Sequence, residues 1–453
     1  MRVSRLERGL GIEVYASKSL GIGGRIRQVP EDFIVEEILV DGSRAEVQPI
    51  KTEQPSVSGR YLTCVLVKRD WDTLLAIKEV SKRLGISYES IQMAGIKDAK
   101  AVTAQHISIG GVSRERVSRL RVRDLILYPL RFSNEKISPH HLWGNQFHIS
   151  VRGITHSSSA IKQRVENVQK ELSYLGGFPN FFGHQRFGTL RPITHLVGSS
   201  LVRGELEKAA LTFLAQPSPH EHPEAREARQ QLQDTRDFRA ATRYFPRHLE
   251  YERLMLGHLS KQPRDYVGAF RRLPLKLRKL FVQAYQAYLF NRFLSQRIQG
   301  GIPMNEAQVG DHVVKLDSHG LPTSESTQVT AQSRSDIREA LEEGRARIAI
   351  PLAGFRQKAS NGSQGEIEKS ILEMEKVAPK DFRISPMPEI SAAGGLRTIL
   401  APMINLTIEM ASQDSANASK RKISLDFMLN RGSYATILLR EFMKPQDPIK
   451  AGF

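Results

Sequence analysis

The stretch Gly95-Ile-Lys-Asp-Ala-Lys-Ala-Val-Thr-Ala-Gln105 sets a charged residue, Asp98, in a turn between two stretches that are patterned like buried strands. Residues 91–94 lead into the turn with mostly apolar side chains, and Val102, Ala104, Ile107 and Ile109 give the return segment an apolar β pattern. This pattern predicts two strands with Asp98 at the tip between them. An aspartate in a polar turn commonly bonds a nearby backbone N–H, so spacing alone favours a structural turn over a catalytic carboxylate.

Length and cysteine content indicate several domains without disulfides. A chain of 453 residues exceeds what one hydrophobic core usually holds, so we expect two or three domains. The single cysteine, Cys64, lies in a strand-like run and is expected to be a small buried apolar residue. Residues 1–18 are rich in charge, and no apolar run approaches the roughly 20 residues of a membrane helix. We therefore expect a cytoplasmic protein without a membrane partner.

The charge balance points to a polyanionic partner. The chain has 66 Lys and Arg against 48 Asp and Glu, a formal net charge of +18. Basic side chains bind phosphates and release the condensed counterions, so nucleic acid is the leading partner class. The basic residues are spread through sequence that looks folded, such as residues 114–123 and 271–279. We therefore expect a basic face on a globular body and no obligate protein partner.

Apolar spacing predicts an α+β protein. A strand begins at Tyr61, and a helix follows it that is capped by Asp72 or Thr73 and ends at Gly85. The inward stripe of that helix is expected to be Leu74, Ile77, Val80 and Leu84. Further amphipathic helices are predicted at residues 157–175 and 277–298.

Three other features are better explained by ordinary structural roles than by a ligand site. The glycines at 21, 23 and 24 lack the spacing of a phosphate-binding loop. His220 and His222 lack further ligands at zinc spacing, so we expect no metal. The charged segment from Glu221 to Glu252 is expected to be mostly a solvated helical face.

Phe147 allows two interpretations. Phe147, Ile149 and Val151 alternate with polar residues, which favours a core position for the aromatic ring. The preceding Gly144 and Asn145 are poor strand residues, which favours an exposed start of the strand and a ring facing a cleft.

The segment Gly176-Gly-Phe-Pro-Asn-Phe-Phe-Gly-His-Gln-Arg-Phe-Gly188 breaks every regular pattern. Glycine, aromatic rings, amides and basic groups suit a loop that grips an unstacked base and its neighbouring phosphates. A packed aromatic loop is the equal structural alternative.

Five stretches together resemble the TruD family of tRNA pseudouridine synthases. They are the 95–105 turn, the basic residue Arg27 before Pro-Glu-Asp-Phe, the Gly144-Asn-Gln-Phe147 segment, the 176–188 loop and the final Leu425-Asp-Phe-Met-Leu-Asn-Arg-Gly-Ser-Tyr434. The resemblance covers nearly the whole chain. It implies a catalytic domain with a mixed, mainly antiparallel sheet and helices, formed by residues 1–177 and 402–453, and a large α+β insertion domain at residues 178–401.

The resemblance also implies roles for single residues. Asp98 would be the catalytic residue, Arg27 would pair with it, and Phe147 would stack on the target base. The further candidates for substrate binding are Lys97, Asn145, Gln185, Arg186 and Phe187. The implied substrate is tRNA, at the D-arm uridine of position 13.

Pseudouridine formation can be performed by one ionised carboxylate without a cofactor. Asp98 would either attack the ribose at C1′ or remove the C2′ proton, and the sequence leaves both open. The reacting uridine must leave its stack, so an aromatic platform and a loop that fills the vacated space are needed. A different class of function also stays open, a noncatalytic RNA-binding or RNA-chaperone protein on the same scaffold. A glycosidase would need two paired acids, and only one stands out.

Overall fold

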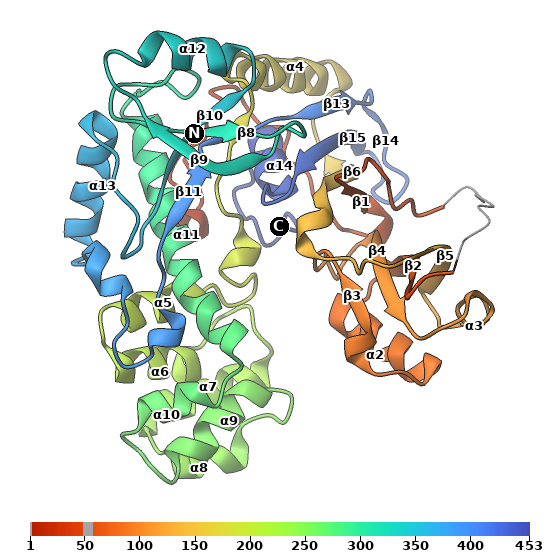
Figure 1. Cartoon of the computed structure of the whole chain (residues 1–453), viewed down its shortest axis with the longest axis vertical. Helices are drawn as coiled ribbons and strands as arrows, with labels where there is room; N and C mark the ends of the chain where they lie inside the picture. Colours follow the sequence, from red (N-terminus) through yellow and green to blue (C-terminus); the bar gives the residue numbers. More distant parts are fainter. Residues whose placement is uncertain (1, 49–57) are drawn as a thin grey trace. The chain divides into compact units, whose positions relative to one another are not determined.

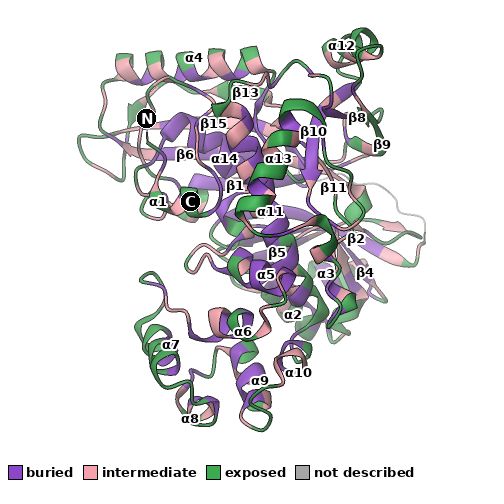
Figure 2. Cartoon of the chain, turned by 90° about the vertical axis from the view of Figure 1, so that its left-hand side faces the viewer, coloured by how far each residue is buried: buried purple, intermediate pink, exposed green. Residues whose placement is uncertain are grey.

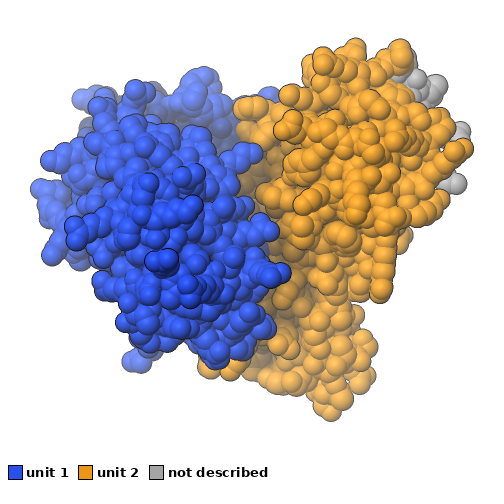
Figure 3. Space-filling view, turned by 90° about the horizontal axis from the view of Figure 1, so that it is seen from below, with its two compact units in different colours: residues 1–16, 179–400, 453 blue, residues 17–178, 401–452 orange. Residues whose placement is uncertain are grey.

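The computed structural model describes residues 2–48 and 58–453, which divide into two compact units. Unit 1 comprises Met1–Ala16, Pro179–Leu400 and Phe453, and unit 2 comprises Ser17–Phe178 and Ala401–Gly452. Figure 3 colours unit 1 blue and unit 2 orange. Asp98 belongs to unit 2. The first sixteen residues pack with unit 1, which the sequence did not indicate.

A sheet of nine strands forms the body of unit 2 within the described residues (Figure 1). The strands are β1 (Phe33–Leu39), β2 (Tyr61–Arg69), β3 (Ile91–Met93), β4 (Val102–Gly110), β5 (Leu125–Ser133), β6 (Leu142–Ile154), β13 (Ile404–Ile408), β14 (Ser412–Gln413) and β15 (Arg421–Asn430). Their order is β13-β15-β6-β1-β4-β2-β5, with β14 beside β15 and β3 beside β4. β1 and β4 run parallel, while β6 is antiparallel to both β1 and β15. The predicted mixed, mainly antiparallel sheet is confirmed.

The strand, helix and strand that lead to Asp98 form as their side chains dictate. Helix α2 (Thr73–Leu84) starts at Asp72, whose Oδ1 accepts hydrogen bonds from the N–H groups of Leu74 and Leu75. It ends at Gly85, whose φ of 57° is left-handed and therefore suits glycine. Ile77, Val80 and Leu84 pack on the sheet as predicted, together with the fully buried Cys64. Leu74 is 43% exposed, so its place on the inward stripe was wrong.

The other helices of unit 2 are α3 (Arg114–Ser118), α4 (Ser158–Leu175) and α14 (Ala435–Met443). Helix α4 confirms the predicted amphipathic helix, because Ile161, Val165, Val168 and Leu172 are its buried residues. Figure 2 shows α4 with exposed and buried positions alternating along its length. Every residue of α14 is buried, so its surroundings and not its own pattern determine where it lies.

Unit 1 combines many helices with a small antiparallel sheet (Figure 1). Its helices are α1 (Arg5–Gly9), α5 (Thr194–Val202), α6 (Leu206–Ala215), α7 (Pro223–Thr235), α8 (Phe238–Tyr244), α9 (Glu250–Leu259), α10 (Tyr266–Arg271), α11 (Leu275–Gln299), α12 (Arg334–Glu342) and α13 (Gly362–Met374). Its sheet has the order β11-β10-β8-β9, built from β8 (His312–Leu316), β9 (Pro322–Gln328), β10 (Ala346–Leu352) and β11 (Gly395–Thr398). Two short strands, β7 (Phe178–Pro179) and β12 (Leu400–Ala401), pair with each other. The long central helix α11 confirms the helix predicted at residues 277–298.

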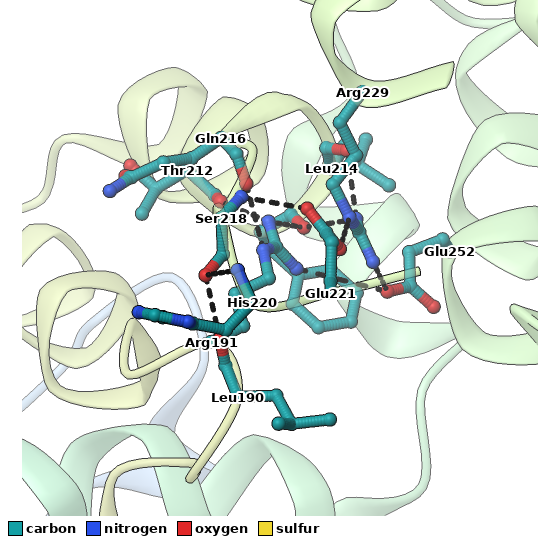
Figure 4. A network of polar contacts seen from close by, with 11 residues as sticks. Leu190, Arg191, Thr212, Leu214, Gln216, Ser218, His220, Glu221, Arg229 and Glu252 are labelled. Carbon is teal, nitrogen blue, oxygen red and sulfur yellow. Dashed lines mark hydrogen bonds and ion pairs between the residues drawn. The ribbon is translucent and has the colours of Figure 1, made fainter. Parts of the chain in front are cut away.

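One buried arginine network in unit 1 is an exception to the solvated helical face predicted between Glu221 and Glu252, where most residues are exposed (Figure 4). Arg229 is 2% exposed and bonds Glu221 Oε2 at 2.9 Å and Glu252 Oε1 at 2.6 Å. Arg191 donates to the carbonyl oxygens of Gln216 and Phe213 beside it, at 2.8 and 2.7 Å. Burial, followed by the nearby Arg229 charge, lowers the pKa of Arg191 to about 9. These charged side chains are thus packed in the interior of unit 1, because the hydrogen bonds and ion pairs of the network satisfy the polar groups that are buried there.

We expect Arg229→Met to lower the free energy of unfolding by about 3–5 kcal/mol, because it leaves the Glu221 and Glu252 carboxylates buried without their partner. Urea unfolding measures the loss. The matched control is Arg239→Met, since Arg239 is an exposed arginine of the neighbouring helix α8 and should change stability by less than about 0.5 kcal/mol. Equal effects of the two substitutions would contradict a structural role for the network.

Candidate active site

Asp98 lies in the segment between β3 and β4, as predicted, and its carboxylate is held by an arginine. Arg27 Nη2 is 2.8 Å from Asp98 Oδ1, and Arg27 Nη1 donates to the Gly452 carbonyl oxygen at 3.0 Å. The Asp98 side chain is 21% exposed and the Arg27 side chain 10%. A carboxylate that is partly open to solvent and held by a mostly buried cation can face a substrate in a fixed orientation.

Three further features characterise Arg27. Its carbon Cζ lies 3.9 Å from the centre of the Phe33 ring, a cation–π contact. Burial lowers the pKa of Arg27, while the Asp98 charge offsets part of this effect. The backbone of Arg27 has a left-handed φ of 55°, which is uncommon for a residue with a side chain and costs about 1–3 kcal/mol. The surrounding structure therefore maintains an unfavourable backbone conformation at the residue that holds Asp98.

Lys97, the residue before Asp98, points away from solvent. Its Nζ donates to Asn145 Oδ1 at 2.7 Å and lies 2.7 Å from Glu37 Oε2. Glu37 is fully buried, and its Oε1 also accepts a hydrogen bond from the His106 N–H. Burial raises the pKa of Glu37, but the His106 contact and the Lys97 charge outweigh it, so the pKa lies below its usual value. The structure thus joins the predicted residues Lys97 and Asn145 directly, and it adds Glu37 as a carboxylate partner of Lys97 that the sequence analysis missed.

Side chains from three elements hold the backbone of the turn. Thr73 Oγ1, at the start of α2, accepts from the Lys97 N–H and donates to the Lys97 carbonyl oxygen, both at 3.1 Å. Gln105 of β4 donates through Nε2 to the Gly95 carbonyl oxygen at 3.0 Å. Lys68 of β2 donates to the Asp98 carbonyl oxygen. Fixed peptide groups around Asp98 restrict where its carboxylate can lie.

Phe147 is not at an exposed strand start. It lies in the interior of β6, opposite Val35 of β1 and Phe427 of β15, and is 5% exposed. Its ring stacks on Phe427 with centroids 5.3 Å apart and meets the edge of Phe33 at 6.2 Å. The interpretation of Phe147 as an exposed strand start was wrong and the core interpretation is confirmed, because β6 already begins at Leu142 and pairs with β1 from there and with β15 from Gly144. The Phe147 ring is linked to the site through Phe33, because the Arg27 guanidinium lies over the Phe33 ring.

The three predicted residues of the 176–188 loop belong to unit 1, whereas Asp98 belongs to unit 2. Gln185 and Arg186 lie in a short 3-10 turn, and Arg186 Nη2 donates to Gln283 Oε1 at 3.2 Å. Phe187 is fully buried in a core with Leu10 and residues of α11. The Phe187 ring is therefore packed, as the alternative of a packed aromatic loop predicted. Contacts of Gln185, Arg186 and Phe187 with substrate stay a prediction.

The comparisons with known proteins agree on one family. The family model described as tRNA pseudouridine synthase D (TruD) matches residues 9–442. The chain belongs to the TruD family of tRNA pseudouridine synthases. A relative from Methanosarcina barkeri, named "Probable tRNA pseudouridine synthase D", is 40% identical over 451 residues, covering 99% of this chain and 100% of the relative. One from Thermococcus onnurineus with the same name is 38% identical, covering 95% and 97%.

A solved structure supports the same family. The chain resembles the crystal structure of a protein from Methanosarcina mazei that is named as tRNA pseudouridine synthase D, with a TM-score of 0.83 and 40% identity. The match covers 98% of this chain and 99% of the other. This TruD fold confirms the predicted α+β class.

Two further observations concern the described part of this TruD chain. Within residues 2–48 and 58–453, no three side chains of His, Cys, Asp or Glu gather as metal ligands would. No helix in the same ranges combines the length and the apolar character needed to cross a membrane.

Glu37 and Lys97 form a buried pair whose single removal we expect to be costly. Glu37→Gln should lower the free energy of unfolding by about 3–5 kcal/mol, because it leaves the Lys97 ammonium buried without a carboxylate. The double variant Glu37→Gln/Lys97→Met should recover part of that loss, since both charges are then gone. Urea unfolding of the single and double variants measures the coupling, and strictly additive effects would contradict it.

The same pair predicts a pH dependence. The folded pKa of Glu37 is lower than its unfolded pKa, so its stabilisation is present above the unfolded value and is lost as the pH falls through the folded value. The stability of Glu37→Gln should therefore decrease less on acidification than that of the wild type.

Phe147→Ala should cost about 3–5 kcal/mol of stability, because it empties a buried ring position. Phe147→Leu keeps most of the volume and should cost less than about 1.5 kcal/mol. The leucine variant separates packing from a role in the reaction. If its stability is retained and its rate falls, the aromatic ring contributes to the reaction, by contact with the base or through Phe33 and Arg27. If both are retained, Phe147 serves packing alone.

Proposed function

We propose that this protein converts a uridine of tRNA to pseudouridine, and that Asp98 is the carboxylate that performs the reaction. The observation that carries the proposal is the ion pair of Asp98 with Arg27, 2.8 Å long, in which the acid keeps some solvent exposure and the base has little. Membership in the TruD family supports the reaction class. The site in the RNA is proposed to be the D-arm uridine at position 13.

The reaction needs no oxidant, reductant or cofactor. The bond between N1 of the base and C1′ of the ribose breaks, the base turns, and C5 bonds to C1′ while the C5 proton leaves and N1 is protonated. Ionised Asp98 would start this sequence by attacking C1′ or by taking the C2′ proton. Arg27 would hold the carboxylate in place through a charge-assisted hydrogen bond.

The proposed binding residues divide into those near Asp98 and those of the loop. The Asn145 amide and the Lys97 ammonium would bind polar groups of the extruded nucleotide after exchanging their contact with each other. Phe147 would meet the base only if neighbouring side chains shift, because its ring is covered by Phe33 and Phe427. Gln185 and Arg186 would bind flanking nucleotides, with the buried Phe187 fixing their loop.

The charge of the chain supports tRNA as the partner. A net charge of +18 suits phosphate neutralisation along a folded RNA. We place the reaction in the cytoplasm as part of the same proposal. The alternative, a noncatalytic RNA-binding protein, requires that the Asp98 turn be structural only, and the backbone contacts from Thr73 and Gln105 are compatible with it.

Asp98→Asn should abolish pseudouridine formation in transcript tRNA while RNA binding and the unfolding midpoint change little, since its amide oxygen can still accept the hydrogen bond from Arg27. Asp98→Ala should also abolish the product, and it should lower the stability because it leaves the mostly buried Arg27 guanidinium without its carboxylate. Mapping pseudouridine along the tRNA measures the product and its position. The matched control is Asp124→Asn, because Asp124 is also an aspartate of unit 2 paired with an arginine, Arg123, at 3.4 Å.

The control should retain full activity. Product formed by the Asp98 variants would place the reactive group elsewhere, and a collapse of the stability of Asp98→Asn would favour the structural turn. Product at another uridine would overturn only the assignment to position 13.

A further inference from the structure

A lysine of the central sheet lies buried behind the Asp98 turn. Lys68 is near the end of β2, beside Thr103 of β4, and is 0% exposed. Its Nζ donates to the carbonyl oxygen of Trp71 at 2.7 Å and to that of Asp98. One ammonium group thus joins the segment before α2 to the residue proposed to perform the reaction.

The charge of Lys68 has no neutralising carboxylate of its own. Both of its hydrogen bonds are to main-chain oxygens, and no carboxylate oxygen in the described part of the chain lies within ion-pair distance of its Nζ. Of the charged groups that face it, Asp98 interacts most strongly, followed by Asp72, Lys97 and Asp70. A buried cation interacts strongly with nearby charge because few water molecules screen it.

We propose that Lys68 is a positioning residue for pseudouridine formation: its ammonium fixes the main chain at Asp98 and places a second positive charge near the Asp98 carboxylate. This inference rests on the proposed function. Arg27 holds the carboxylate at its tip, whereas Lys68 holds the peptide group that carries it. With both ends held, the carboxylate oxygens have little freedom to move away from the reacting ribose.

The same chain contains a matched control. Lys444 in unit 2 is also buried, at 7% exposure, and its Nζ also donates to two carbonyl oxygens, those of Ser17 and Ser19. Burial is the largest effect on its pKa and lowers it, as for Lys68. The acids that act on Lys444 are Glu441 and Glu171, not Asp98. A substitution at Lys444 therefore removes the same kind of structural contact without touching the proposed catalytic turn.

The inference has a signature in pH. Burial lowers the pKa of Lys68 to about 8, against the opposing effect of Asp98. Below that pH the Lys68 ammonium is charged and holds the Asp98 turn through its hydrogen bonds. Above that pH the positive charge of Lys68 is lost, and the rate should fall. The wild type should therefore lose activity on the alkaline side near this value, whereas an arginine, which stays protonated, should not.

The test measures single-turnover pseudouridylation of transcript tRNA by the wild type, Lys68→Met, Lys68→Arg and Lys444→Met across the neutral and alkaline range. Lys68→Met should lower the maximal rate roughly 100-fold at neutral pH, leave the tRNA concentration for half-maximal rate unchanged, and lack the alkaline decline. Lys68→Arg should restore part of the rate and lack the decline too. Lys444→Met should keep the rate and the profile of the wild type, whatever stability it loses.

The outcomes separate the two proposals. A wild type that forms no pseudouridine in tRNA, or an active Asp98→Asn, refutes the proposed function itself. An active wild type with a folded Lys68→Met of undiminished rate and unchanged profile overturns the inference on Lys68. If Lys68→Met does not fold, the pH profile of Lys68→Arg tests the inference instead. If this variant shows the same alkaline decline as the wild type, the decline comes from another group, and the inference on Lys68 is overturned.

Discussion

The structure around Asp98 depends on placing positive charge in a protein interior. Arg27, Lys68 and Lys97 surround one short turn, and each is at least nine-tenths buried by its side-chain or residue exposure. The carboxylates of Asp98 and Glu37 form ion pairs with Arg27 and Lys97, whereas Lys68 is hydrogen-bonded to main-chain oxygens and feels the charges of Asp98, Asp72 and Asp70. Buried cations are costly unless hydrogen bonds satisfy them. Main-chain carbonyl oxygens supply such bonds, that of Gly452 to Arg27 and those of Trp71 and Asp98 to Lys68.

The pairing of the strands determines which groups reach that turn. Glu37 is opposite Asn145 and Val35 opposite Phe147, so these residues of β1 and β6 share one face of the sheet. The parallel pairing of β1 with β4 adds Thr103 beside Val35, and Lys68 is opposite Thr103. A shift of one residue in any of these pairings would move the side chains to the other face. The polar site therefore requires the same register that buries the apolar core.

Local pattern was sufficient for the elements next to Asp98 and insufficient for contacts between distant segments. The turn between β3 and β4, the cap at Asp72 and the end of α2 at Gly85 are set by neighbouring residues, so the sequence predicted them. Glu37 and Lys68 could have been noticed as charges within apolar strands, but their partners come from other strands and loops. Charge-rich composition likewise gave no sign that Arg229 is buried with Glu221 and Glu252, because packing of separate helices creates that environment.

Phe147 shows why burial and a role in the site need not exclude each other. Its alternation with Ile149 and Val151 indicated a core residue, and the structure places the ring between Phe33 and Phe427. Phe33 in turn lies against the guanidinium that holds Asp98. A change in the packing of Phe147 would therefore move Phe33, and with it Arg27, before it affected any base directly. Phe147 can thus influence the reaction through its contact with Phe33, the contact of Phe33 with Arg27, and the ion pair of Arg27 with Asp98. A sequence pattern that places a residue in the core is therefore no argument against its influence on the reaction.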